Sequence, residues 1–174
     1  EELEIRGAFL IRAVSFEDER GIFRRNFCKK EFAEHGIVTG VAQANISENK
    51  YKYTLRGFHY QISPHGEAKT MTILKGRIYD IIVDLRKESD TYLKWISFEI
   101  SPDNRTSFYV PPGCANAFLT MEDETLVHYY CSYSYTSDAE RGLRYSDPLF
   151  KFKWPVVEPL HISDKDASWP DFDV

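Results

Sequence analysis

The stretch "LRGFHYQ", Leu55 to Gln61, places an arginine, a glycine and a histidine in a segment that otherwise resembles a β-strand. Histidine is suited to proton transfer near neutral pH, and the arginine fork is suited to phosphate. In a regular strand His59 shares its face with Gly57, whereas Arg56 points to the opposite face. The two side chains can therefore reach one site only if the strand bulges, and glycine is the residue at which a bulge is easiest.

Two further segments carry reactive side chains on predicted strands. Lys69 of "SPHGEAKT" is in phase with Met71 and Ile73, and a lysine in an apolar phase is uncommon unless a negative charge lies opposite. In "LVHYYCSYSY" one face carries Val127, Tyr129, Cys131, Tyr133 and Tyr135. Such tyrosines could donate protons or fill the interior of a barrel, and an isolated histidine is more often structural. The residues alone leave these alternatives open.

No pattern of metal ligands is present. The sequence has no HxH or HxxH pair, and the turn "VPPGCANAF" carries Asn116 where a ligand would be expected. We therefore predict that no metal is bound. The three cysteines are odd in number and never form CxxC pairs, which argues against disulfides and zinc and favours a reducing cytoplasm.

Composition restricts the class of partner. With 22 Lys+Arg against 27 Asp+Glu, the net charge of −5 provides no global positive field for nucleic acid or an anionic membrane. No apolar run approaches the roughly 20 residues of a membrane span, and the N-terminus lacks a secretory leader. The 174 residues fit one domain, 1–174, which we expect to be soluble and cytoplasmic.

Short apolar or alternating runs recur along the chain between Gly, Pro, Asp and Asn turn signals. The most periodic is "RIYDIIVDLR", Arg77 to Arg86, which predicts a strand with two unlike faces. Helix is predicted only for Lys29–Gly36 and near "SDKDASW". Many short strands at this spacing predict a mostly β protein, with a cupin-like jelly roll and few short helices.

Taken in order, these motifs resemble the dTDP-4-dehydrorhamnose 3,5-epimerase family over nearly the whole chain. The resemblance rests on "DERGIFRR", "QANIS", "LRGFHYQ", "PHGEAK", "VDLRKESDTYLKW", "VPPGCANAF", "YSDPLFKFKWP" and "ISDKDASWP". It implies a homodimeric jelly roll that uses no cofactor. The implied substrate is a nucleotide-diphosphate sugar, in which stereocentres beside a 4-keto group are inverted.

Such an epimerisation needs a base, an acid on the opposite face and a group that stabilises the enolate oxygen. The resemblance implies His59 as the base, oriented by Asp166, with Tyr129 as the acid and Lys69 at the enolate oxygen. For substrate binding it implies a further set: Arg20, Phe23, Gln43, Asn45, Arg56, Glu140 and Lys165. We also expect Asn116 and Tyr133 to contact the substrate.

The sequence departs from the family pattern at several positions. Arg25 stands where the family carries a glutamate that reads the base, so dTDP, CDP, GDP and UDP are all considered. Asn116 replaces a histidine and can act neither as a base nor as a cation, which would limit the reaction to one carbon. Cys114 and Tyr145 also replace larger aromatic residues, which indicates a pocket shaped for a different sugar.

Three alternatives to a 3,5-epimerase therefore stay open. They are a C3-only epimerase on a nucleotide other than dTDP, a 3,4-ketoisomerase and a non-catalytic sugar-nucleotide binder. The sequence does not identify the pathway, because lipopolysaccharide, capsule and antibiotic sugars all pass through 4-keto intermediates.

Overall fold

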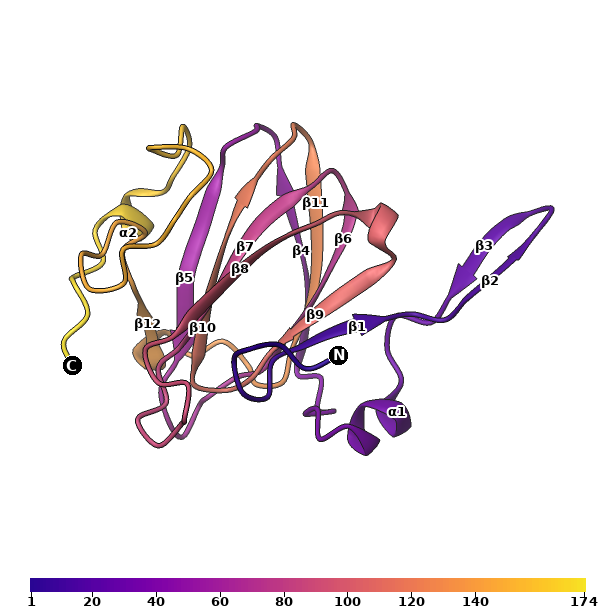
Figure 1. Ribbon diagram of the computed structural model, residues 1–174, viewed down its shortest axis with the longest axis horizontal. Helices are drawn as coiled ribbons and strands as arrows, with labels where there is room; N and C mark the ends of the chain where they lie inside the picture. The colour runs from indigo at the N-terminus through magenta and orange to yellow at the C-terminus, as the bar shows by residue number, and fades with distance from the viewer.

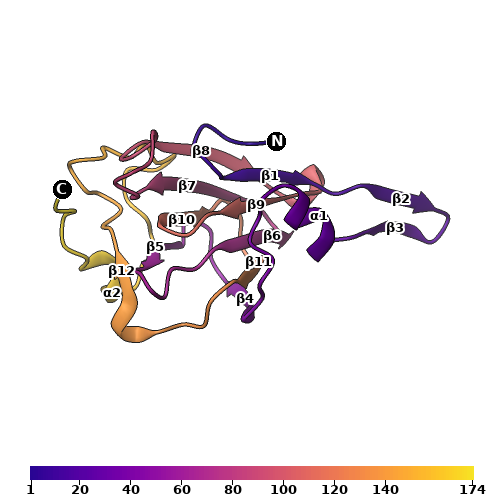
Figure 2. The same cartoon turned by 90° about the horizontal axis from the view of Figure 1, so that it is seen from below.

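The computed structural model describes residues 1–174 and is built mainly from antiparallel strands in two five-stranded sheets that face each other (Figures 1 and 2). The first sheet has the order β1 (Phe9–Arg12), β9 (Thr106–Val110), β6 (Lys69–Lys75), β11 (Thr125–Cys131) and β4 (Gln43–Asn49). The second has the order β12 (Glu140–Gly142), β5 (Leu55–Gln61), β10 (Cys114–Thr120), β7 (Ile78–Asp84) and β8 (Trp95–Ile100). The predicted mostly β, cupin-like jelly roll is confirmed.

Apolar side chains fill the space between the sheets and also cover the outer face of the second sheet. Ile73 of β6 and Ile82 of β7 belong to the inner cluster. Ile81 on the opposite face of β7 packs in a second cluster with Leu143 and Phe150 from the C-terminal part of the chain. This explains the periodic "RIYDIIVDLR" stretch, because β7 is buried on both of its faces.

The helices are few and short. The segments predicted as helical contain α1 (Lys29–Glu34) and α2 (Asp164–Ala167), and the 3-10 turns η1 (Pro102–Asn104) and η2 (Ser137–Ala139) complete the set. Ser163 caps α2 by accepting a hydrogen bond from the backbone N–H of Asp166 at 3.1 Å. None of the helices has the length and apolar character required to cross a bilayer.

A separate two-stranded hairpin, β2 (Ser15–Asp18) and β3 (Gly21–Arg24), projects away from both sheets (Figures 1 and 2). Its aromatic side chains are not covered, since Phe16 is 65% exposed and Phe23 is 67% exposed. Isolated hairpins with exposed apolar side chains are marginally stable in water, so this hairpin is a natural site for contact with another surface.

The strand that carries "LRGFHYQ" contains the bulge that the sequence required. Along the pairing of β5 with β10, His59 lies opposite Asn116 and Arg56 lies opposite Phe118. Two residues of β5 therefore face one residue of β10 between these pairs. Gly57 lies at this irregularity with a φ of +113°, a backbone conformation that glycine adopts readily. The bulge is confirmed, and it brings Arg56 and His59 onto the same wall of one cavity.

A substitution at this bulge tests its role. A Cβ atom at position 57 would lie 2.6 Å from the backbone oxygen of Asn116 and 2.7 Å from the Cα of Ala117. We expect Gly57→Ala to lower the free energy of unfolding by about 3 kcal/mol or more, from overpacking and left-handed strain together. Urea unfolding of the purified variant measures this change.

Gly36→Ala is the matched control. Gly36 also has a positive φ, +72°, but nothing lies within 4 Å of its Cβ position. Gly36→Ala should therefore lower the free energy of unfolding only by the cost of the left-handed backbone conformation, about 1–2 kcal/mol. Equal losses for the two variants would show that close packing at Gly57 contributes nothing.

Candidate active site

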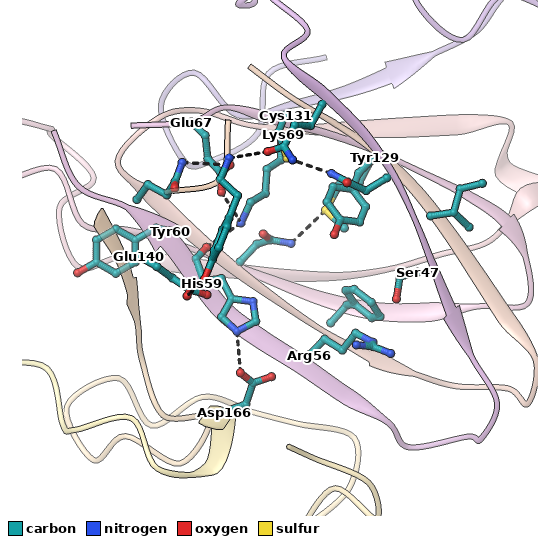
Figure 3. A pocket seen from close by; sticks show the side chains of 18 of the residues that line it. Ser47, Arg56, His59, Tyr60, Glu67, Lys69, Tyr129, Cys131, Glu140 and Asp166 are labelled. Atoms are coloured by element: carbon teal, nitrogen blue, oxygen red, sulfur yellow. Dashed lines mark hydrogen bonds and ion pairs between the residues drawn. The ribbon is translucent and has the colours of Figure 1, made fainter. Parts of the chain in front are cut away.

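A cavity of about 570 Å³ opens between the two sheets and collects most of the side chains selected from the sequence. Its lining includes nine of them: His59, Asp166, Tyr129, Lys69, Gln43, Asn45, Arg56, Asn116 and Glu140. Figure 3 shows labelled members of this set around one space, with His59 and Arg56 on β5. Because the residues come from both sheets, a bound molecule would be approached from two sides.

His59 and Asp166 form a short hydrogen-bonded pair at the wall of the cavity (Figure 3). The His59 Nε2 atom lies 2.6 Å from Asp166 Oδ1, and an ionised carboxylate can only accept, so Nε2 carries the proton. The other ring nitrogen, Nδ1, has no hydrogen-bond partner in the chain. This arrangement leaves a lone pair on Nδ1 that is available to a ligand.

The Asp166 carboxylate is held from several sides. Its second oxygen accepts a hydrogen bond from the Gly57 backbone N–H at 3.2 Å. Burial by itself raises the pKa of Asp166, but hydrogen bonds from His59 and Gly57 and the nearby charge of Lys165 outweigh it, so the pKa lies below its ordinary value. Asp166 is therefore ionised at neutral pH, which lets it support a charged imidazolium on His59.

Tyr129 lies on β11 of the first sheet, opposite the strand that carries His59. The Tyr129 hydroxyl makes no hydrogen bond within the chain, and Figure 3 shows the ring at the cavity. Burial raises the pKa of Tyr129, with contributions from Cys131 and Glu67, against the lowering effect of Arg56. The hydroxyl is protonated at neutral pH and can serve as a proton donor.

Cationic side chains reach the cavity from both sheets. Lys69 at the start of β6 donates a hydrogen bond from Nζ to the backbone oxygen of His59 at 2.8 Å. Arg56 Nε donates to Asn49 Oδ1 at 2.7 Å, which fixes the guanidinium while its terminal nitrogens make no bond in the chain. Arginine held in this way is suited to two-point contact with a phosphate group.

Four of the selected residues lie outside the cavity lining. Arg20 and Phe23 lie on the projecting hairpin, where Arg20 pairs with Asp18. Tyr133 lies beyond the end of β11 and its ring is in edge contact with His65. Lys165 lies at the edge of the site, where its Nζ donates to Glu140 Oε2 at 2.5 Å.

Several lining residues were not selected from the sequence, among them Gln61, Glu67, Cys131 and Tyr135. Gln61 Oε1 accepts from the backbone N–H of Thr136 at 2.6 Å, which ties β5 to the segment after β11. Strand parity could have selected Gln61, because it shares its face with His59. Glu67 lies in the loop between β5 and β6, where the alternation of side chains along a strand does not predict which way a residue points.

Asn116 is almost buried and hydrogen-bonds to a fully buried carboxyl group. Its Nδ2 donates to Asp80 Oδ2 at 3.0 Å, whereas Asp80 Oδ1 has no partner. Burial raises the pKa of Asp80 well above its ordinary value, and the hydrogen bond from Asn116 and the charge of Lys69 offset this only in part. Burial therefore favours the neutral, protonated form of the Asp80 carboxyl group.

These positions define what the site can do chemically. An imidazole nitrogen and a phenol face the cavity from opposing sheets, and a lysine ammonium is hydrogen-bonded to the backbone oxygen of His59. Such a set can remove a proton from one face of a carbon acid and return one from the other face. No group of three or more His, Cys, Asp or Glu side chains is arranged to hold a metal ion.

Comparison with known proteins places this geometry in a family. The chain matches the family model described as dTDP-4-dehydrorhamnose 3,5-epimerase over residues 2–173. It is 38% identical to the dTDP-4-dehydrorhamnose 3,5-epimerase of Methanothermobacter thermautotrophicus over 165 residues, covering 94% of this chain and 88% of the relative.

Solved structures are similar over nearly the full length. The crystal structure of dTDP-4-dehydrorhamnose 3,5-epimerase from Bacillus anthracis with TDP and PPi bound is 34% identical, with a TM-score of 0.94 and coverage of 98% of this chain and 97% of that chain. A 3′-monoepimerase from Streptomyces bikiniensis in complex with dTDP-quinovose is 30% identical, with a TM-score of 0.89 and coverage of 97% and 85%.

The buried carboxylate of Asp166 predicts a specific pH dependence of stability. Because its pKa is lower in the folded chain, its contribution is present above the unfolded value of about 3.9 and is lost as the pH falls through the folded value. We expect Asp166→Asn to be less stable than the wild type by about 1–3 kcal/mol near pH 6. The difference should narrow below about pH 4, as measured by urea unfolding at each pH.

The control is Asp164→Asn, an exposed carboxylate on the same helix. It should change stability by less than about 0.5 kcal/mol. An Asp166→Asn difference that stayed constant down to pH 2 would contradict the assigned ionisation of Asp166.

Proposed function

Because the chain belongs to the dTDP-4-dehydrorhamnose 3,5-epimerase family and is an isomerase of the nucleotide-sugar epimerase class, we propose that it inverts carbons beside the 4-keto group of a nucleoside-diphosphate 4-keto-6-deoxy sugar. One observation carries this proposal. His59 on the second sheet, paired with Asp166 of α2, and Tyr129 on the first sheet reach one cavity from opposite sides. We propose that residues 1–174 act as one domain.

The proposed reaction uses these groups in sequence. His59 Nδ1 takes the proton from the carbon beside the ketone, and the electrons of the broken C–H bond move to the ketone oxygen as an enolate. Lys69 donates a hydrogen bond to that oxygen. The enolate then collapses, and the carbon takes the Tyr129 proton from the opposite face. Solvent removes the proton from His59 and returns one to Tyr129.

The charge of the imidazolium is met by Asp166, whose carboxylate lies 2.6 Å from Nε2. This contact supports the assignment of His59 as the base, because the cation formed in the first step is stabilised where it forms. The enolate negative charge has its counterpart in Lys69 on β6. The two developing charges are therefore each matched by a fixed group.

For the nucleotide, we propose a thymidine diphosphate sugar. The Bacillus anthracis relative binds TDP and the Streptomyces bikiniensis relative binds dTDP-quinovose, which supports this class. Arg56 would meet the diphosphate, as its terminal nitrogens are free of protein partners. Arg25, which stands at the family's glutamate position, pairs with Glu31 at 2.9 Å and lies outside the cavity lining, so CDP, GDP and UDP sugars belong in the assay.

We also propose that the chain works as a homodimer in the cytoplasm. Arg20 and Phe23, which the family resemblance assigns to the substrate, lie on the hairpin that projects from the body of the chain. A hairpin of this kind can supply those residues to the cavity of a second copy. All three cysteines are free thiols, which fits a reducing compartment.

A second candidate, epimerisation at C3 alone, is favoured by one observation. Asn116, which hydrogen-bonds to the buried Asp80, stands where the family carries a histidine. Asn116 can neither act as a base nor become a cation, so it cannot take over the proton transfer that a histidine there would provide at a second carbon.

Hydrogen–deuterium exchange tests the function directly. The wild type, in D₂O with a dTDP-4-keto-6-deoxy sugar, should place deuterium at carbons beside the ketone, as read by NMR. His59→Ala and Tyr129→Phe should slow exchange by about 10²-fold or more. Deuterium at C3 and C5 supports double epimerisation, and deuterium at C3 alone supports the second candidate.

Other outcomes would overturn the proposal. A 3-keto product would indicate a 3,4-ketoisomerase. Binding without exchange for dTDP, CDP, GDP and UDP sugars would indicate a sugar-nucleotide binder.

A further inference from the structure

We propose that Glu67 is a positioning residue that holds the Lys69 ammonium at the place where the ketone oxygen of the substrate becomes an enolate. This inference rests on the proposed function of Lys69 and deepens it. Glu67 lines the cavity but takes no part in the proton transfers described above. The proton transfers therefore do not explain why a carboxylate lies at this position of the cavity.

The two charged groups are nearly removed from water. The side chains of Glu67 and Lys69 are 11% and 12% exposed, and Lys69 Nζ lies 3.4 Å from Glu67 Oε1. Burial of an unpaired carboxylate or ammonium is strongly unfavourable. The pairing therefore accounts for a lysine in phase with the buried residues Met71 and Ile73.

The carboxylate of Glu67 receives donors from three different strands (Figure 3). Besides Lys69 of β6, Gln61 Nε2 of β5 lies 3.5 Å from Glu67 Oε2. The Cys131 thiol of β11 also hydrogen-bonds to Glu67, and burial and the charge of Glu67 raise the pKa of this thiol to about 12. Cys131 thus remains a neutral S–H donor.

Lys69 has a second fixed contact that directs its ammonium. Nζ donates to the backbone oxygen of His59 at 2.8 Å, on the same residue that serves as the base. An ammonium has three N–H donors, and the contacts to His59 and Glu67 use two of them. The third is left for a ligand in the cavity, beside the carbon from which His59 takes the proton.

The surroundings of this pair contain several other titratable or charged groups. From the elements packed against it these are His59 and Arg56 of β5, Asp80 of β7, and Tyr129 and Cys131 of β11. When His59 becomes an imidazolium, it and Lys69 are two cationic side chains in the cavity, one from each sheet. The negative charge of Glu67, paired with Lys69, offsets part of their mutual repulsion.

The test is Glu67→Gln, which keeps the size and removes the charge. Its kcat for epimerisation should fall by about 10- to 100-fold, with KM within about threefold, because the lost interaction acts in the transition state. Glu88→Gln, at an exposed turn outside the cavity, should leave kcat and KM unchanged.

A double variant separates positioning from direct catalysis and from folding. If Glu67 acts through Lys69, adding Glu67→Gln to Lys69→Met should cause no further loss of kcat, whereas independent effects would multiply. A further 10-fold loss in that background would overturn the proposal, as would a single variant whose kcat equals that of the wild type. Deuterium exchange by the wild type is measured in the same assay. A wild type that exchanges no deuterium would contradict the epimerase function itself, whereas an active wild type with an unaffected Glu67→Gln variant would contradict only the role of Glu67.

Discussion

The bulge at Gly57 is the constraint on which the rest of the site depends. It changes the alternation of β5, so that Arg56 and His59 reach the same cavity. It also aims the Gly57 backbone N–H at Asp166 Oδ2, at 3.2 Å. The backbone irregularity that brings His59 into the cavity therefore also orients the Asp166 carboxylate, which hydrogen-bonds to His59. A side chain at position 57 would collide with β10, which ties both effects to glycine.

Two pairs of oppositely charged side chains line the site. His59 is paired with Asp166, and Lys69 with Glu67. Arg56 has no carboxylate partner and is held instead by the neutral amide of Asn49. Arg56 thus makes no ion pair within the chain, and its guanidinium is available to a diphosphate. The cavity therefore contains both ion-paired side chains and an arginine without a carboxylate partner.

The sequence predicts what depends on local alternation and turn chemistry. The face of Tyr129 on β11, the phase of Lys69 on β6 and the need for a bulge at Gly57 all follow from a period of two. The pairing of His59 with Asp166 spans 107 residues, and no local pattern reports such a contact; only the family resemblance indicated it. Glu67 was missed because a turn residue has no strand phase. Arg20 and Phe23 lie on a hairpin that projects from both sheets, and strand alternation does not predict the direction in which such a hairpin points.

The central claim is that His59 and Tyr129 approach the sugar from opposite faces. A crystal structure of the protein with a bound dTDP-6-deoxy sugar tests it most directly. The account predicts His59 Nδ1 within about 3.5 Å of a ring carbon beside C4, the Tyr129 hydroxyl on the other face, and the diphosphate at Arg56. It also predicts Arg20 and Phe23 of a second copy at the nucleotide. A sugar with both groups on one face, or one lying beyond the reach of His59, would contradict the account.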